Sequence, residues 1–210
     1  MRWREQTEKR GYHHGNLREA LVAAALDLIS SKGPAGFTFA EAARQAGVSA
    51  AAPYRHFRDR DTLIADVARR GFDLFAERLA GAWNEGKPSA FEALMRLCRA
   101  YLEFAGNEPA YYAAMFEAGL PLESHADCRE ASERAFNVLR SACDVIAAAI
   151  PQGSRPPPMM MALHVWSMSH GVASLFARGD AARRPLPMPP EQLLEAGVMI
   201  YLDGLGARRS

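Results

Sequence analysis

One 21-residue stretch, from Phe37 to Phe57, constrains the fold of this chain more than any other part of the sequence. It predicts two short helices joined by a tight turn at Gly47, because glycine reaches a left-handed backbone without steric cost. Thr38 and Ser49 stand where side-chain oxygens can cap the first and the second helix. This helix-turn-helix arrangement can place its second helix in the DNA major groove. The alternative is an ordinary helical hairpin within a helical core.

The surface predicted to enter the groove is nearly all methyl groups, because Ala50, Ala51 and Ala52 precede Pro53. Alanine methyls can contact thymine methyls, but they offer no bidentate hydrogen bonds to base edges. We therefore expect arginines of the stretch and the shape of the DNA to carry much of the sequence preference. Tyr54 follows directly, three residues before the aromatic end of the stretch. At that helical spacing one ring packs inward while the other points outward.

Several segments resemble a known family. They are a first helix at Leu17–Lys32, a connector at Gly33–Thr38, a turn at Ala46–Ser49 and a closing Tyr54–Phe57. From about Tyr12 to Phe75 the chain is similar to the DNA-binding domain of the TetR family of bacterial transcriptional regulators. Two further segments are similar to one subgroup of that family, named for a Trp-x-x-x-His-Gly (WHG) signature: Tyr12–Leu17 and His164–Gly171.

The resemblance implies an all-α fold of about nine helices. A three-helix head with the helix-turn-helix would occupy residues 14–60, and a helical bundle for dimerisation and ligand binding would occupy residues 61–210. Residues 1–13 would form a basic tail, which is either solvated or an arm that reaches the DNA. The implied function is a dimeric, DNA-binding repressor that a small apolar or aromatic ligand releases from its operator.

The same resemblance implies that Tyr54 donates a hydrogen bond to a phosphate and that Thr38 does so at a helix N-terminus. Arg60 would meet the backbone of the other strand, and His56 either contacts a phosphate or supports the turn. The expected DNA-binding residues are Thr38, Arg44, Ser49, Ala50, Ala51, Ala52, Pro53, Tyr54, Arg55, His56, Arg58 and Arg60.

The charge distribution agrees with DNA binding. The first 70 residues hold 12 Lys and Arg against 8 Asp and Glu, whereas the remainder holds 13 against 16. The basic excess thus accompanies the helix-turn-helix, as phosphate binding requires. Three irregularly spaced cysteines (Cys98, Cys128, Cys143) give neither a disulfide framework nor a metal site, so we expect buried reduced thiols and no cofactor or metal. We find no apolar run long enough to cross a membrane and expect a cytoplasmic protein.

Two sets of body residues are candidates for the remaining functions. Small and apolar residues on the last two helices can form a two-fold homodimer interface, or they can simply close the core of one subunit. These are Ser167, Gly171, Ser174, Leu193, Gly197, Ile200, Tyr201 and Gly204. Aromatic and methionine side chains of the middle helices can line a ligand pocket, or be plain core. These are Phe91, Met95, Tyr101, Tyr112, Met115, Phe116, Met161, Trp166 and His170.

Two alternatives concern single positions. Gly71 interrupts a long helix expected from near Asp59 to about Trp83, and it permits either close packing or a hinge. Trp166 and His170 lie one turn apart and can be hydrogen-bonded structural groups or ligand contacts.

Two other classes of protein compete with the DNA-binding interpretation. No metalloprotease helix motif, phosphate-binding glycine loop or nucleophile elbow is present, which argues against an enzyme. A helical scaffold without DNA binding is the second alternative.

Overall fold

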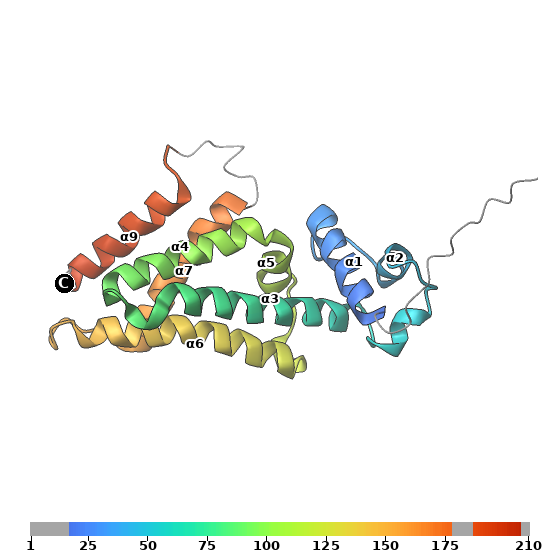
Figure 1. Ribbon diagram of the computed structural model, residues 1–210, viewed down its shortest axis with the longest axis horizontal. Coiled ribbons are helices and arrows are strands. Elements are labelled where there is room, and N and C mark those ends of the chain that lie inside the picture. The colour runs from blue at the N-terminus through green and yellow to red at the C-terminus, as the bar shows by residue number, and fades with distance from the viewer. Residues whose placement is uncertain (1–16, 178–186, 207–210) are drawn as a thin grey trace, which may run out of the picture.

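The computed structural model describes residues 17–177 and 187–206, and within them the chain is helical without any strand (Figure 1). This confirms the predicted all-α class. The predicted basic tail, 1–13, lies outside the described residues. The α-helices are α1 (Leu17–Lys32), α2 (Phe39–Gln45), α3 (Arg60–Trp83), α4 (Ala90–Asn107), α5 (Pro109–Phe116), α6 (Ala126–Ala148), α7 (Pro158–Ala177) and α9 (Pro190–Gly204). Three short 3-10 helices connect them: η1 (Ala52–Arg55), η2 (Asn84–Gly86) and η3 (Leu122–Ser124).

The molecule has a small head and a larger body, joined by α3 (Figure 1). Helices α1 and α2 form the head together with η1. Helix α3 begins beneath the head and continues into the body, where its most extensive contact is with α6. Helices α4 and α5 also pack against α3, and α7 packs between α4, α6 and α9. One long helix therefore belongs to both parts of the molecule.

The predicted start and end of α2 are confirmed. The Thr38 hydroxyl accepts a hydrogen bond from the backbone N–H of Glu41 (3.2 Å), and the Glu41 carboxylate accepts one from the backbone N–H of Thr38 (2.8 Å). This reciprocal pair is a capping box. After the helix, Gly47 takes a φ of +74°, and the N–H of Val48 bonds back to the carbonyl of Ala43 (3.0 Å). The turn thus closes as a Schellman motif, which requires the left-handed residue.

The second helix of the motif differs from the prediction. It is the 3-10 helix η1, and its N-cap is Ala51 with no side-chain hydrogen bond, so the predicted cap by Ser49 is wrong. The physical reason is Pro53, which has no N–H to donate to the carbonyl four residues earlier. Instead, the N–H of Ala52 donates a hydrogen bond to the Ser49 carbonyl (3.0 Å), and this bond tightens the first turn.

Gly71 packs closely against a neighbouring helix, which decides between the two alternatives for this position. It is buried in α3 against α5. A Cβ placed there would stand 2.7 Å from the Met115 sulfur and 3.2 Å from the Cβ of Tyr111. The absence of a side chain therefore lets α5 approach α3.

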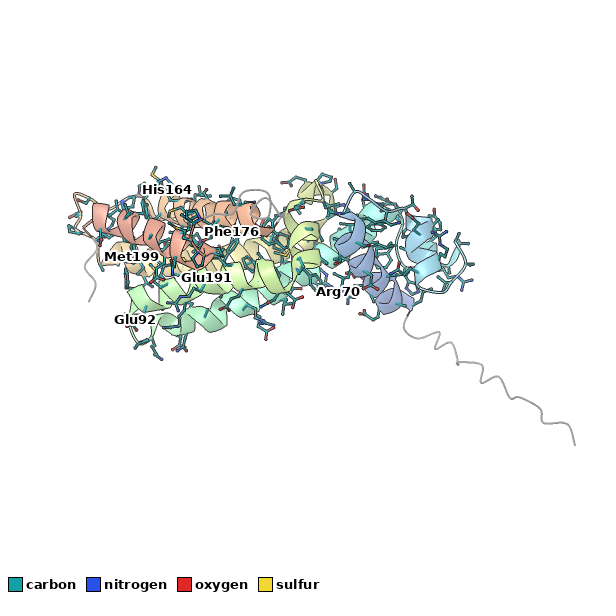
Figure 2. All side chains as sticks on the ribbon, turned by 90° about the horizontal axis from the view of Figure 1, so that it is seen from above. Arg70, Glu92, His164, Phe176, Glu191 and Met199 are labelled. Atoms are coloured by element: carbon teal, nitrogen blue, oxygen red, sulfur yellow. The ribbon has the colours of Figure 1, made fainter. Side chains whose placement is uncertain are left out.

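Charged side chains join the head to the body around Asp66 of α3, whose side chain is only 5% exposed. It accepts hydrogen bonds from Arg18 of α1 (2.9 Å), Arg69 (3.2 Å) and Arg70 (3.1 Å). Burial opposes ionisation of this carboxyl, but the three guanidinium groups outweigh it and lower its pKa. Arg70, which Figure 2 places at the junction, also binds Glu19 of α1 with contacts of 2.5 and 2.6 Å. These contacts fix α1 to α3 at the junction of the head and the body.

Candidate DNA interface and ligand cavity

Tyr54 is the most exposed aromatic side chain of the head. It is 63% exposed, and its ring meets the ring of Phe39 edge-on, with centroids 5.1 Å apart. Phe57, three residues later, is 2% exposed and packs in the core. The prediction that one ring points outward and one inward is confirmed. Sequence reasoning missed Phe39, whose position at the start of α2 supports Tyr54 from a neighbouring element.

Exposed basic groups lie on both sides of Tyr54 in the sequence. The Arg44 side chain is 79% exposed and that of Arg58 is 84% exposed, and Arg55 is exposed as well. Of the residues predicted to enter the groove, Ser49, Ala50 and Ala51 are exposed, and Ala52 is half-buried. Pro53 is buried, so it supports the surface from beneath and cannot contact DNA.

Of two further residues predicted to bind DNA, Arg60 contacts protein groups and His56 is exposed beside a hollow. Arg60 lies over the ring of Phe37 at 5.0 Å and donates to the carbonyls of Phe37 (2.9 Å) and Pro34. It therefore fastens the connector between α1 and α2 to the start of α3. His56 is exposed and lines a hollow of about 220 Å³ that also includes His125, before the first turn of α6. That position suits the alternative in which His56 supports the head.

The carboxylates at the starts of α2 and α3, those of Glu41 and Asp59, have pKa values below their ordinary range. Hydrogen bonds from Lys32 and Thr38 lower the pKa of Glu41 to about 2. Hydrogen bonds from the Thr62 side chain and backbone, with one from Arg58, lower the pKa of Asp59 to about 2. Both stand at helix N-termini, where the backbone N–H groups favour a negative charge.

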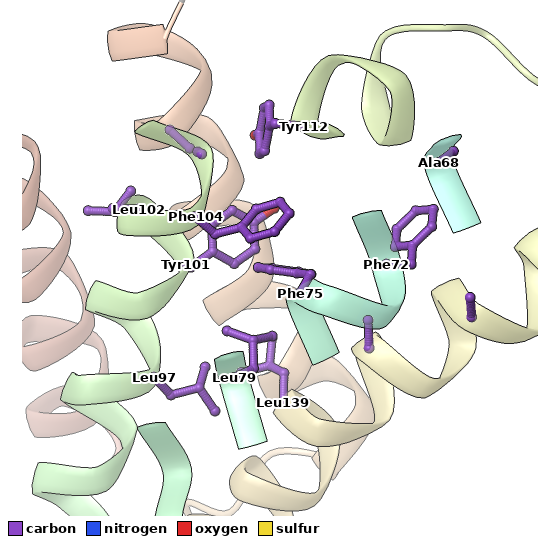
Figure 3. Close-up of a cluster of buried hydrophobic side chains, with 14 of the residues drawn as sticks. Ala68, Phe72, Phe75, Leu79, Leu97, Tyr101, Leu102, Phe104, Tyr112 and Leu139 are labelled. Atoms are coloured by element: carbon purple, nitrogen blue, oxygen red, sulfur yellow. The ribbon is translucent and has the colours of Figure 1, made fainter. Parts of the chain in front are cut away.

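The body contains a cavity of about 400 Å³ between α3, α4, α5, α6 and α7. Figure 3 shows its inner wall, where Phe72, Phe75 and Leu79 of α3 lie near Tyr101 of α4 and Leu139 of α6. The ring of Phe75 meets that of Tyr101 edge-on at 4.9 Å. The full lining is Phe72, Phe75, Leu79, Tyr101, Met115, Phe116, Leu122, Ser132, Ala135, Phe136, Leu139, Leu163 and Trp166.

Four of the nine residues predicted to line a pocket lie in this wall: Tyr101, Met115, Phe116 and Trp166. The other five do not. Met95, Tyr112 and Met161 are buried core residues. Phe91 packs half-buried against the core away from the cavity, and His170 lies behind the wall. Sequence reasoning missed the contribution of α3 and α6, although the α6 residues at 132, 135, 136 and 139 follow helical spacing and could have signalled it.

A cluster of rings supports the wall behind Tyr101. The hydroxyls of Tyr101 and Tyr112 lie 3.1 and 2.9 Å from Nδ1 of His170. The imidazole stacks on Trp166, with centroids 5.4 Å apart and planes at 27°. This geometry matches the structural alternative for His170, a hydrogen-bonded group inside the body, while Trp166 both stacks on it and lines the cavity.

None of the eight residues predicted at a dimer interface is buried in the single chain. Ser167, Gly171, Ile200 and Gly204 are exposed, and the other four are half-buried. Ile200 is 73% exposed, and a Cβ at Gly171 or Gly204 would meet open space. Among the half-buried four, Tyr201 also has a partner in its own subunit, since its hydroxyl lies 3.0 Å from Nδ1 of His164.

The three cysteines are buried and reduced, as predicted. Burial raises the pKa of Cys98 to about 12, that of Cys128 to about 11 and that of Cys143 to about 12, so all three remain thiols at neutral pH. Across residues 17–177 and 187–206, no helix has both the length and the apolar character needed to span a bilayer.

Comparison with known proteins identifies the same two parts. Residues 21–67 match the family described as "Bacterial regulatory proteins, tetR family", and residues 94–200 match "Tetracyclin repressor-like, C-terminal domain". One relative, "Uncharacterized HTH-type transcriptional regulator YobS" of Bacillus subtilis (strain 168), is 27% identical over 100 residues. That alignment covers 48% of this chain and only 51% of the relative, about half its length.

Solved structures share the fold over nearly the whole chain. A protein with unknown function from Rhodococcus sp. RHA1 is 28% identical, with a TM-score of 0.77 over 95% of this chain and 100% of that one. The TetR family transcriptional regulator PfmR from Thermus thermophilus is 20% identical, with a TM-score of 0.62 over 90% and 99% of the two chains.

The head and the matched families define a helix-turn-helix transcriptional regulator, a DNA-binding protein and not an enzyme. The chain belongs to the TetR family of bacterial regulators.

Proposed function

We propose that this chain binds its operator as a homodimer, and that it is a cytoplasmic repressor that a small apolar or aromatic ligand releases from DNA. One observation carries the proposal: Tyr54 stands exposed on Phe39, among exposed arginines, on a face of the head that no described residue covers. We divide the chain into a tail at 1–13, a head at 14–60 and a body at 61–210.

The DNA contacts that we propose fall into two groups. Tyr54, Thr38 and Arg58 would bind phosphates and set the register, with His56 either binding a phosphate or supporting the turn. Arg44 and Arg55 would reach base edges, and the methyl groups of Ala50–Ala52 would pack in the groove. Ser49 stands exposed beside them.

Dimerisation through α7 and α9 is supported by the exposed apolar and small side chains on that face. Leu175 is 50% exposed and Ile200 is 73% exposed, while Gly171 and Gly204 leave room for a neighbouring helix. Because one head reads only a few base pairs, two heads are needed for a specific two-fold site. A ligand in the cavity would favour one tilt of α3 and so one separation of the two heads.

The DNA-binding part of the proposal is tested by footprinting on DNA upstream of the chain's own gene and its neighbour. Two protected half-sites related by a two-fold axis are expected, with affinity falling as salt rises because phosphate contacts release counterions. Absence of any preferred site, or affinity independent of salt, would contradict the proposal.

The dimer part is tested by measuring mass in solution by light scattering. Ile200→Asp should convert a dimer into monomers, because it buries a charge in the proposed interface. Val145→Asp is the matched control, since Val145 is 50% exposed on α6, a helix outside the proposed interface. Equal masses for the two variants would refute this interface.

A further inference from the structure

The wall of the cavity described above carries no formal charge at neutral pH. Its described lining consists of aromatic, aliphatic and methionine side chains together with three neutral polar residues. Those three are Tyr101, Ser132 and Trp166, which carry two hydroxyls and an indole N–H, and the Tyr101 hydroxyl also contacts Nδ1 of His170. The chemistry of this wall decides what kind of molecule it can accept.

The polar groups of the wall stay neutral. Burial raises the pKa of Tyr101 well above its ordinary value, so its hydroxyl remains protonated. The neighbouring ion pairs along α3 and α6 are those of Asp73 with Arg69 (2.8 Å) and with Arg134 (2.7 Å). None of these three residues lines the cavity, and Arg69 lines a separate hollow beside the head. No Lys or Arg of residues 17–177 and 187–206 lines the cavity, and the imidazole of His170 lies behind the wall, 3.1 Å from the Tyr101 hydroxyl.

These features select against charged molecules. An ionised carboxylate or phosphate entering the cavity would lose its hydration and find no cation in the wall. An aromatic ring, by contrast, would meet Phe72, Phe75 and Phe136, with room for edge-to-face packing. The volume of about 400 Å³ lies in the range of small-molecule sites.

We propose that the effector is an uncharged molecule of one or more aromatic rings that carries a hydroxyl or carbonyl oxygen. The oxygen would exchange hydrogen bonds with Tyr101, Ser132 or Trp166, and the rings would occupy the apolar part of the cavity. This inference rests on the proposed ligand-regulated function and narrows it to a chemical class.

The first test compares two probes that share a ring system and differ in charge, 2-naphthol and 2-naphthoate. Binding to the full chain is measured by calorimetry at pH 7.5, where the first is neutral and the second is an anion. At least a tenfold preference for 2-naphthol is expected. Equal affinity, a preference for 2-naphthoate, or binding of neither probe overturns the inference.

The second test moves a charge into the wall. Ser132→Arg should shift the preference toward 2-naphthoate at least tenfold, because it supplies the missing cation. Asn137→Arg adds the same charge to the exposed side of α6 and should leave the ratio unchanged. Ala135→Phe fills the cavity and should weaken both probes at least tenfold. If Ser132→Arg does not fold, probe binding to Ala135→Phe and to the unmodified chain still tests the proposed ligand class.

The outcomes separate this inference from the proposed function. Probe binding is measured without DNA, and the effect of each probe on the operator complex is measured separately by gel shift. A preference for 2-naphthoate with intact operator binding overturns only the ligand class. Selective 2-naphthol binding that leaves the operator complex unchanged supports the ligand class and contradicts ligand release.

Discussion

The head and the body carry their candidate sites in opposite ways. The head presents its site outward, on one contiguous stretch from Thr38 to Arg60, held by caps, a glycine turn and a proline-tightened 3-10 helix. The body forms its cavity between side chains that range from Phe72 to Trp166 along the chain. A local site can be identified from spacing alone, whereas a cavity between helices depends on how distant helices meet.

The two regions also differ in what stabilises them. In the head, carboxylates at helix N-termini secure the starts of α2 and α3, as at Glu41 and Asp59. In the body, stability comes from buried aromatic rings such as Phe75 and Tyr101. Substitutions in the body should therefore change mainly the free energy of unfolding, and substitutions on the exposed face of the head should change mainly DNA affinity.

The largest expected effect is that of Phe75→Ala in the body. Phe75 is 4% exposed and contacts the rings of Tyr101 and Phe104, so the change enlarges the cavity. We expect the free energy of unfolding to fall by about 3–5 kcal/mol, measured by urea denaturation. Operator affinity of the folded protein should stay within twofold. A loss below about 1 kcal/mol would contradict the importance of this packing.

Next in size is the difference between two glycines. Gly71→Ala should destabilise by about 1–3 kcal/mol and displace Met115 toward the cavity, because the new Cβ meets the Met115 sulfur. Gly47→Ala meets no atom, and its cost of about 1 kcal/mol comes only from the positive φ. The free energy of unfolding of both variants, measured by urea denaturation, and their affinity for 2-naphthol check these expectations. Only Gly71→Ala should weaken the probe, and equal probe affinities would refute the displacement.

Tyr54→Ala tests the head at constant stability. Loss of the phosphate contact should weaken operator binding about tenfold, or about 1.4 kcal/mol, at fixed salt. Because Tyr54 is exposed, unfolding should change by less than about 0.5 kcal/mol. Tyr54→Phe is the matched control, since it keeps the contact with Phe39 and removes only the hydroxyl. Unchanged affinity for Tyr54→Ala, measured by fluorescence anisotropy, would remove Tyr54 from the interface.

The smallest expected effect is an acid sensitivity at the start of α3. The pKa of Asp59 in the folded protein is about 2, below its ordinary value of 3.8. Its contribution is therefore present above about pH 4 and is lost as pH falls toward 2. Ser89 caps α4 in the body without titrating in this range.

Amide hydrogen exchange, corrected for its intrinsic pH dependence, checks this difference. Protection at the start of α3 should fall between pH 4 and 2 more than protection at the start of α4. Asp59→Asn keeps a cap acceptor and should remove that difference. Parallel losses at the two helix starts would argue against the capping role of Asp59.

Much of the head followed from residue patterns, and what did not follow has physical reasons. Thr38 and Gly47 act locally, so their cap and turn were predictable from spacing. The 3-10 geometry at Pro53 arises because proline has no backbone N–H to donate, and the spacing of apolar residues does not report a missing hydrogen bond. Arg60 contacts the ring of Phe37 because the connector folds back on α3. No local sequence pattern predicts that fold.

The sequence by itself determined that the chain is helical, that its head holds a helix-turn-helix with its turn at Gly47, and that one of the two rings at the end of that motif points outward. These features depend on interactions a few residues apart. Only the tertiary structure decided which buried side chains line the cavity. Helical periodicity predicts that Met95 and Phe75 both face inward, but it does not predict which of the two is packed on all sides. Packing between five helices left the cavity beside Phe75 and filled the space around Met95.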